Sequence, residues 1–126
     1  MSRLRLLLVD DSSAIRSLVA SALADLPEVE VVGAAPDGKA ALGLVPQVRP
    51  DVILLDVEMP VMDGLDTLAA LRKEHPGIPV IMFSSLTEKG TATTIKALFL
   101  GASDFAAKPA NVSSADAARR EVREIL

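Results

Sequence analysis

The chain has 126 residues, half of them hydrophobic, and carries a formal net charge of −4 at pH 7. That length suits one domain with its own core, and the absence of cysteine excludes both a disulfide framework and a thiolate metal site. The acidic balance disfavours nucleic-acid binding, and no apolar run approaches the roughly 20 residues of a membrane-spanning helix, so we expect a cytoplasmic protein that binds neither nucleic acid nor a membrane.

Five short segments have the composition of strands in a parallel sheet. The clearest is Val52 to Asp56, a run of aliphatic residues that is too short for a helix and ends on a carboxylate. Continuous apolar runs of this kind are typical of strands buried on both faces. In chain order, the predicted strands are Leu4–Val9, Val29–Ala35, Val52–Asp56, Pro79–Phe83 and Asp104–Ala107.

Segments with helical spacing separate and follow these strands. In the fourth of them, Ile95 and Leu98 form the apolar stripe, so both are expected to be buried. The alternation of strands and helices indicates a single α/β domain with an all-parallel sheet. The predicted helices run from Ser12 or Ser13 to before Pro27, from Asp37-Gly38 to before Pro50, from about Gly64 to His75, from after Gly90 to Gly101, and from Ser114 to about Leu126.

Polar side chains end four of the five predicted strands. Asp10 and Asp11 follow the first strand, Asp56 ends the third, Ser84 follows the fourth and Lys108 follows the fifth. If these strands are neighbours, the side chains converge at the carboxyl edge of the sheet, where open parallel sheets bind their ligands. Converging carboxylates repel one another unless a cation lies among them, and donor sets made only of oxygen favour Mg²⁺ over zinc.

The same residue types suit the transfer of a phosphoryl group. A carboxylate beside bound Mg²⁺ can attack phosphorus and become an acyl phosphate. Phosphoryl transfer otherwise needs positioning and charge neutralisation, for which Lys108 offers an ammonium group and Ser84 a hydroxyl group. The sequence therefore predicts a Mg²⁺-dependent phosphoryl-transfer site.

These strand-end residues, together with the MPVMDG segment after Asp56 and the Lys108-Pro109 pair, resemble the receiver domain of bacterial two-component response regulators. The resemblance covers essentially the whole chain, so one receiver domain is expected over residues 1–126. It implies a flavodoxin-like, doubly wound (βα)5 fold with the strand order 2-1-3-4-5. It also implies Asp56 as the phosphoacceptor and Asp11 as a direct Mg²⁺ ligand, with Asp10 acting through water.

The resemblance assigns further roles around the acceptor. The main-chain carbonyl of Glu58 would be another Mg²⁺ ligand, and the Glu58 side chain would influence the lifetime of the phosphoryl group. Ser84 and Phe105, which stands where the family often has Tyr, would be switch residues. The fourth helix, the fifth strand and the fifth helix would form the output face, on which Phe99 and Phe105 lie.

Within that family, the segment from Phe83 to Pro109 looks most like the receiver of the chemotaxis protein-glutamate methylesterase. This resemblance implies a sensor histidine kinase, here a chemotaxis kinase, as phosphodonor and a methylesterase output domain in the same chain, beyond residue 126. The 126 residues contain no G-x-S-x-G motif and only one histidine, so we expect no esterase chemistry in them. Phe99, one residue past Leu98, is expected to be an exposed contact to that output domain.

Other interpretations remain open at this point. The chain could be a stand-alone receiver. A haloacid-dehalogenase-like phosphatase also uses a strand-end Asp and Mg²⁺, but it needs a second Asp where this chain has Glu58. A flavodoxin-like electron carrier would place an FMN phosphate against the repelling Asp10-Asp11 pair, and a P-loop nucleotide binder would need a G-x-x-x-x-G-K-[ST] motif that this sequence lacks.

Overall fold

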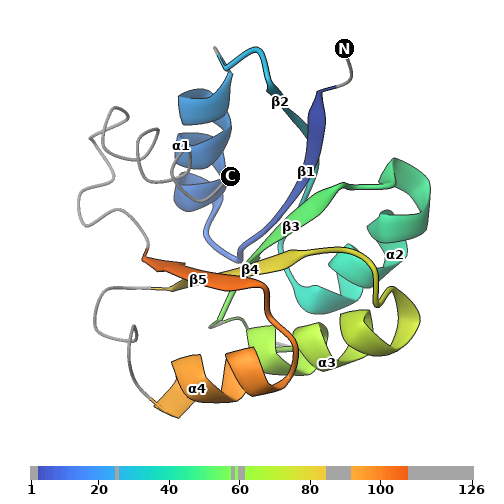
Figure 1. Ribbon diagram of the computed structural model, residues 1–126. Helices are drawn as coiled ribbons and strands as arrows, with labels where there is room; N and C mark the ends of the chain where they lie inside the picture. Colours follow the sequence, from blue (N-terminus) through green and yellow to red (C-terminus); the bar gives the residue numbers. More distant parts are fainter. Residues whose placement is uncertain (1–2, 25, 58, 60–61, 85–91, 108–126) are drawn as a thin grey trace.

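The computed structural model describes residues 3–24, 26–57, 59, 62–84 and 92–107. Within these ranges, five parallel strands form one sheet in the order β2-β1-β3-β4-β5 (Figure 1). The predicted order is therefore confirmed. The strands are β1 (Leu4–Val9), β2 (Val29–Ala35), β3 (Val52–Asp56), β4 (Val80–Ser84) and β5 (Asp104–Ala107).

Four helices connect these strands within the described ranges. Three of them begin at a capping side chain: Ser12, Asp37 and Asp63 each accept a hydrogen bond from a backbone N–H of the first turn. The start at Ser12 or Ser13 and the start at Asp37-Gly38 were predicted, and the cap at Asp63 was not. The helices are α1 (Ser13–Leu23), α2 (Gly38–Val48), α3 (Gly64–Glu74) and α4 (Ala92–Phe99). The predicted fifth helix, Ser114 to about Leu126, lies outside the described residues.

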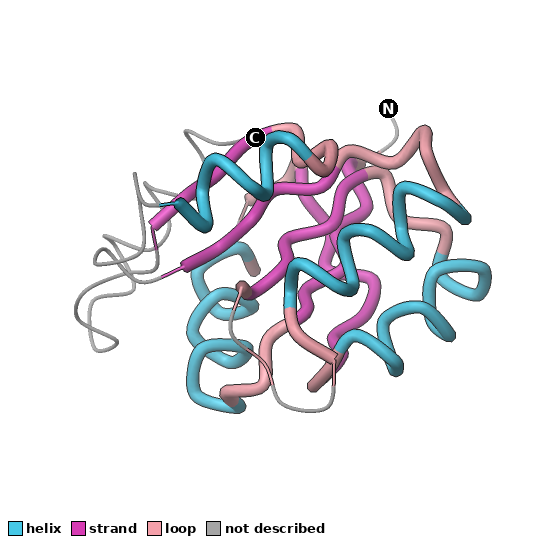
Figure 2. Tube along the Cα trace, turned by 90° about the horizontal axis from the view of Figure 1, so that it is seen from below, coloured by secondary structure: helices cyan, strands magenta, loops and turns pink. Residues whose placement is uncertain are grey.

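Helices cover both faces of the sheet (Figure 2). Side chains alternate between the two faces along each strand, and each face therefore has its own apolar cluster. The cluster on the α1 side contains Ile15, Val19, Leu23, Leu6, Leu8, Leu54, Ile81 and Phe83. The cluster on the side of α2, α3 and α4 contains Ala41, Val45, Leu68, Leu71, Ala97, Leu7, Val9, Ile53, Leu55, Val80 and Met82. The central strands β1, β3 and β4 contribute to both clusters and are therefore packed on both faces.

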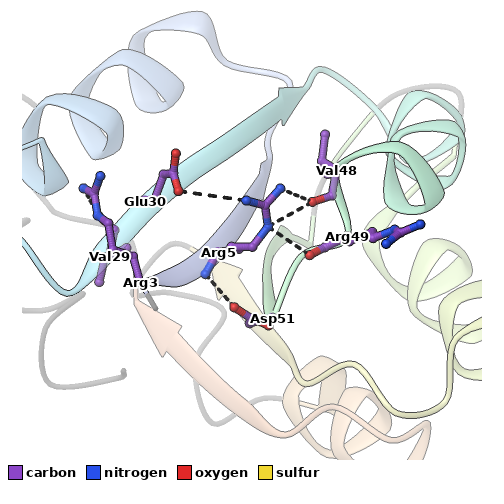
Figure 3. Close-up of polar contacts among 7 residues, drawn as sticks. All are labelled: Arg3, Arg5, Val29, Glu30, Val48, Arg49 and Asp51. Carbon is purple, nitrogen blue, oxygen red and sulfur yellow. Dashed lines mark hydrogen bonds and ion pairs between the residues drawn. The ribbon is translucent and has the colours of Figure 1, made fainter. Parts of the chain in front are cut away.

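Arg5 fixes the opposite, amino edge of the sheet (Figure 3). Its Nη2 atom donates to the carbonyl oxygen of Val48 at 2.6 Å, and its Nε atom donates to the carbonyl oxygen of Arg49 at 3.3 Å. Arg49 ends α2 in the left-handed conformation, with φ of 48°. A cation that caps these carbonyls stabilises the end of the helix, so the side chain of Arg5 joins β1 to α2.

The predicted register of α4 is wrong for Leu98. Its side chain is 49% exposed, whereas Ala97 is completely buried against the cluster beneath α3 and α4. A stripe of two apolar residues does not determine a helical face, and the small Ala97 side chain lets this short helix lie close to the sheet. The exposure expected for Phe99 is confirmed at 91%, and the helix stops before Gly101, whose φ is +108°.

Candidate functional site

Three carboxylates meet at the carboxyl edge of the sheet. Val9 and Leu55 are register partners in the paired strands β1 and β3, so Asp10 and Asp56, which follow them, lie next to each other. One carboxylate oxygen from each of Asp10, Asp11 and Asp56 lies within 4.8 Å of the others. Asp10 and Asp56 are buried, with 0% and 1% exposure, and Asp11 is exposed. The predicted convergence of these three residues is confirmed.

The turn that carries Asp10 and Asp11 is held by hydrogen bonds on several sides. The Asp10 N–H donates to the carbonyl oxygen of Ala35 at 3.0 Å, and the Ser12 N–H donates to Oδ1 of Asp10 at 2.8 Å. Ser12 in turn caps α1 by accepting from the Ile15 N–H at 3.2 Å. The guanidinium of Arg16 donates to the main-chain oxygen of Asp10 at 2.6 Å. Sequence reasoning did not identify Arg16 as part of this site.

Asp56 is held by its strand and by the start of α3. Val57 donates its N–H to the carbonyl oxygen of Phe83 at 3.2 Å, and Gly64 donates to the carbonyl oxygen of Val57 at 2.8 Å. A Cβ atom on Gly64 would lie 2.2 Å from the Asp56 carbonyl oxygen and 2.6 Å from the Cα of Val57. The single glycine of the MPVMDG segment therefore lets α3 approach the backbone at the end of β3.

This close approach predicts unequal effects for two Gly→Ala substitutions. Gly64→Ala should reduce the free energy of unfolding by about 1–3 kcal/mol, the usual cost of overpacking. Gly43→Ala, in the middle of α2 with open space around its Cα, should instead raise that free energy by up to about 1 kcal/mol through helix propensity. Urea unfolding followed by circular dichroism measures both. Equal stability of the two variants would show that α3 does not pack on the Asp56 backbone.

The fourth and fifth strands also end at this edge. Asp56 is the register partner of Phe83, and Ser84 is the partner of Ala107, the residue before Lys108. The side chains of Ser84 and Phe105, and the whole of Glu58 and Lys108, lie outside the described residues. Their assigned roles therefore stay predictions.

The donor set fits a hard divalent cation. Among the residues that the structure describes, Asp10, Asp11 and Asp56 form the group of His, Cys, Asp or Glu side chains close enough together to hold a metal ion. All three offer carboxylate oxygens, the ligands that Mg²⁺ prefers, and no nitrogen or sulfur donor takes part. None of the described helices is both long and apolar enough to cross a membrane.

Comparison with known proteins gives one consistent result. The family described as "Response regulator receiver domain" matches residues 6–118. A protein-glutamate methylesterase/protein-glutamine glutaminase of Nocardioides sp. is 49% identical over 126 residues, which is 100% of this chain and 34% of that protein. Its counterpart in Trichodesmium erythraeum is 47% identical over 100% of this chain and 36% of its own length.

Among solved structures, the response regulator domain of Thermotoga maritima CheB superposes with a TM-score of 0.85 at 40% sequence identity. That similarity covers 98% of this chain and 91% of the other. The chain thus spans about a third of the length of the two curated relatives and nearly all of the solved domain.

Proposed function

The chain belongs to the response regulator receiver domain family, and from that membership we propose that it accepts a phosphoryl group from a sensor histidine kinase on Asp56. It is a receiver of the kind found in CheB-like response regulators, and we propose that residues 1–126 form one such domain. The observation that carries the proposal is the meeting of three carboxylates within 4.8 Å at the ends of β1 and β3. We propose that the reaction takes place in the cytoplasm. The chain has no cysteine and therefore no disulfide that would need an oxidising environment.

We propose a role for each carboxylate in this reaction. Asp10, Asp11 and Asp56 would hold Mg²⁺, with the Glu58 carbonyl as a further ligand, and the bound ion would neutralise charge on the phosphoryl oxygens. A carboxylate oxygen of Asp56 attacks the phosphorus, and the bond from phosphorus to the histidine nitrogen of the kinase breaks. Burial of Asp56 and Asp10 excludes water from one side of the acceptor. Lys108 and Ser84 would bind the transferred oxygens.

The stoichiometry of phosphorylation tests this function against the phosphatase alternative. A receiver incubated with acetyl phosphate and Mg²⁺ should gain about 80 Da once, the mass of one phosphoryl group. A phosphatase would instead release inorganic phosphate through many turnovers without lasting mass gain. Mass spectrometry and a phosphate-release assay on the same sample distinguish the two outcomes, and turnover without a modified species would reject the receiver mechanism.

Phosphorylation would be read out through the neighbouring strands. Ser84 ends β4, and Phe105 on β5 is the register partner of Met82. An inward movement of Ser84 and Lys108 towards the phosphoryl oxygens would therefore shift β4 and β5, and with them Phe105 and α4. Such a shift is a local charge change that biases a two-state element.

The partner of this switch would be an output domain in a longer chain. The two curated relatives are about three times as long as this chain and carry the name of a methylesterase, and we propose a chemotaxis kinase upstream and a methylesterase domain downstream. On α4, Phe99 is 91% exposed and the adjacent Leu98 is 49% exposed. Neighbouring exposed apolar side chains suit a docking contact with that domain.

This arrangement predicts the effect of a charge on α4. We propose that this contact holds the unphosphorylated methylesterase inactive. Phe99→Asp in the full-length protein should then leave phosphorylation of Asp56 intact and raise methylesterase activity without phosphodonor on the order of tenfold, because an aromatic anchor of the inhibitory contact is lost. Ala69→Asp, at an exposed position of α3, is the matched control and should leave basal activity unchanged. Unchanged basal activity in Phe99→Asp would reject the docking of α4 on the output domain.

A further inference from the structure

Arg16 holds the peptide that links two of the three carboxylates. Its guanidinium, half-buried on the first turn of α1, reaches back six residues to donate to the main-chain oxygen of Asp10 at 2.6 Å. A hydrogen bond from a charged donor is stronger than one between neutral groups. The bond therefore restrains the Asp10 carbonyl, which belongs to the planar peptide unit between Asp10 and Asp11.

This restraint matters most for Asp11. The side chain of Asp10 is buried and accepts a hydrogen bond from the Ser12 N–H, whereas Asp11 is exposed and gains little from packing. The direction of the Asp11 side chain depends on the orientation of the peptide before it, because that peptide plane sets the position of its Cα atom. Loss of the Arg16 contact should let the plane rotate and move the Asp11 carboxylate away from Asp10 and Asp56.

We infer that Arg16 is a positioning residue for the Mg²⁺ site, acting through the Asp10–Asp11 peptide and not through its charge. The inference rests on the proposed function. Charge alone predicts the opposite sign: removal of a cation near three carboxylates should strengthen the binding of another cation. A positioning role predicts that Mg²⁺ binding weakens when Arg16 is removed, although the site becomes more negative.

The test is a Mg²⁺ titration of the metal-free protein, followed by ¹⁵N–¹H NMR at fixed pH and ionic strength. Arg16→Met should raise the Kd for Mg²⁺ about tenfold or more, as for other groups that orient metal ligands. Arg5→Met is the matched control, because Arg5 also binds main-chain carbonyls but lies at the amino end of β1 (Figure 3). It removes the same charge and a comparable structural contact, and its Kd should stay within about twofold of the wild-type value, since distant charges are screened.

Arg16→Lys separates position from charge, because it retains the charge without the planar fork of donors. The Kd of Arg16→Lys for Mg²⁺ should also rise. If the NMR spectrum of Arg16→Met lacks the amide pattern of the folded protein, the titration of Arg16→Lys tests the inference in its place. A Kd at or below the wild-type value in the folded Arg16 variants would overturn the inference while leaving the proposed function intact. Absence of Mg²⁺ binding by the wild-type protein would instead overturn the proposed function and the inference together.

Discussion

Asp56→Asn is expected to abolish phosphorylation by acetyl phosphate, reducing the modified fraction at least about a hundredfold, as the loss of a nucleophile does in enzymes. An amide is nearly the same shape as a carboxylate but carries no anionic oxygen to attack phosphorus. Asp56 is the last residue of a strand in which every side chain is buried. The substitution should therefore remove the nucleophile without rearranging the sheet around it.

The matched control is Asp51→Asn, at the other end of the same strand. Asp51 is exposed, and its Oδ2 atom accepts a hydrogen bond from the backbone N–H of Arg5 at 2.9 Å. The amide oxygen of Asn can accept the same hydrogen bond. This variant should be phosphorylated like the wild type. Full, hydroxylamine-labile phosphorylation of Asp56→Asn, measured by intact-protein mass spectrometry, would reject Asp56 as the acceptor.

Removal of a carboxylate should stabilise the metal-free protein. In chelator at neutral pH, Asp56→Asn should have a free energy of unfolding higher than the wild type by on the order of 2 kcal/mol, the repulsion between like charges a few ångströms apart at the intermediate dielectric of a protein. Asp11→Ala should gain less, because the exposed Asp11 side chain is screened by water. The chain has no Trp or Tyr, so circular dichroism in urea is the suitable probe.

Addition of Mg²⁺ should stabilise the wild type more than either variant. A ligand that binds only the folded protein stabilises it in proportion to the logarithm of its concentration above Kd. Millimolar Mg²⁺ should therefore raise the melting temperature of the wild type more than that of either variant. Two results would contradict this prediction: a wild-type melting temperature that does not respond to Mg²⁺, or variants that are less stable than the wild type in chelator. Either would show that these carboxylates do not form a cation site in which they repel one another.

The features that could be predicted from the sequence are those that depend on the buried strands. Val52–Asp56 is a continuous apolar run with a carboxylate at its end, and a run of this kind is typical of a central strand that is buried on both faces. Once the carboxyl ends of parallel strands are assigned to one edge, the meeting of Asp10, Asp11 and Asp56 follows. The start of β4 was misplaced by one residue, because Pro79 has no N–H to donate to a sheet.

Other features depend on tertiary contacts that no local sequence pattern indicates. Leu98 was predicted to be buried because two apolar residues suggested a stripe, but the tertiary fit of the small Ala97 decided the register of α4. No pattern in the sequence distinguishes Arg16 from other charged residues of the helical segments. Its role becomes visible only when the turn before α1 places the Asp10 carbonyl within reach of its guanidinium.

Chemical trapping identifies the residue that carries the phosphoryl group. Wild-type protein phosphorylated with acetyl phosphate and Mg²⁺ is reduced with borohydride, which converts an aspartyl phosphate into homoserine, and the digested peptides are sequenced by mass spectrometry. If Asp56 carries the phosphoryl group, homoserine will appear at position 56 and at no other aspartate. Homoserine at Asp10 or Asp11, or a phosphorylated protein in which position 56 remains aspartate after reduction, would contradict the assignment of Asp56 as the acceptor.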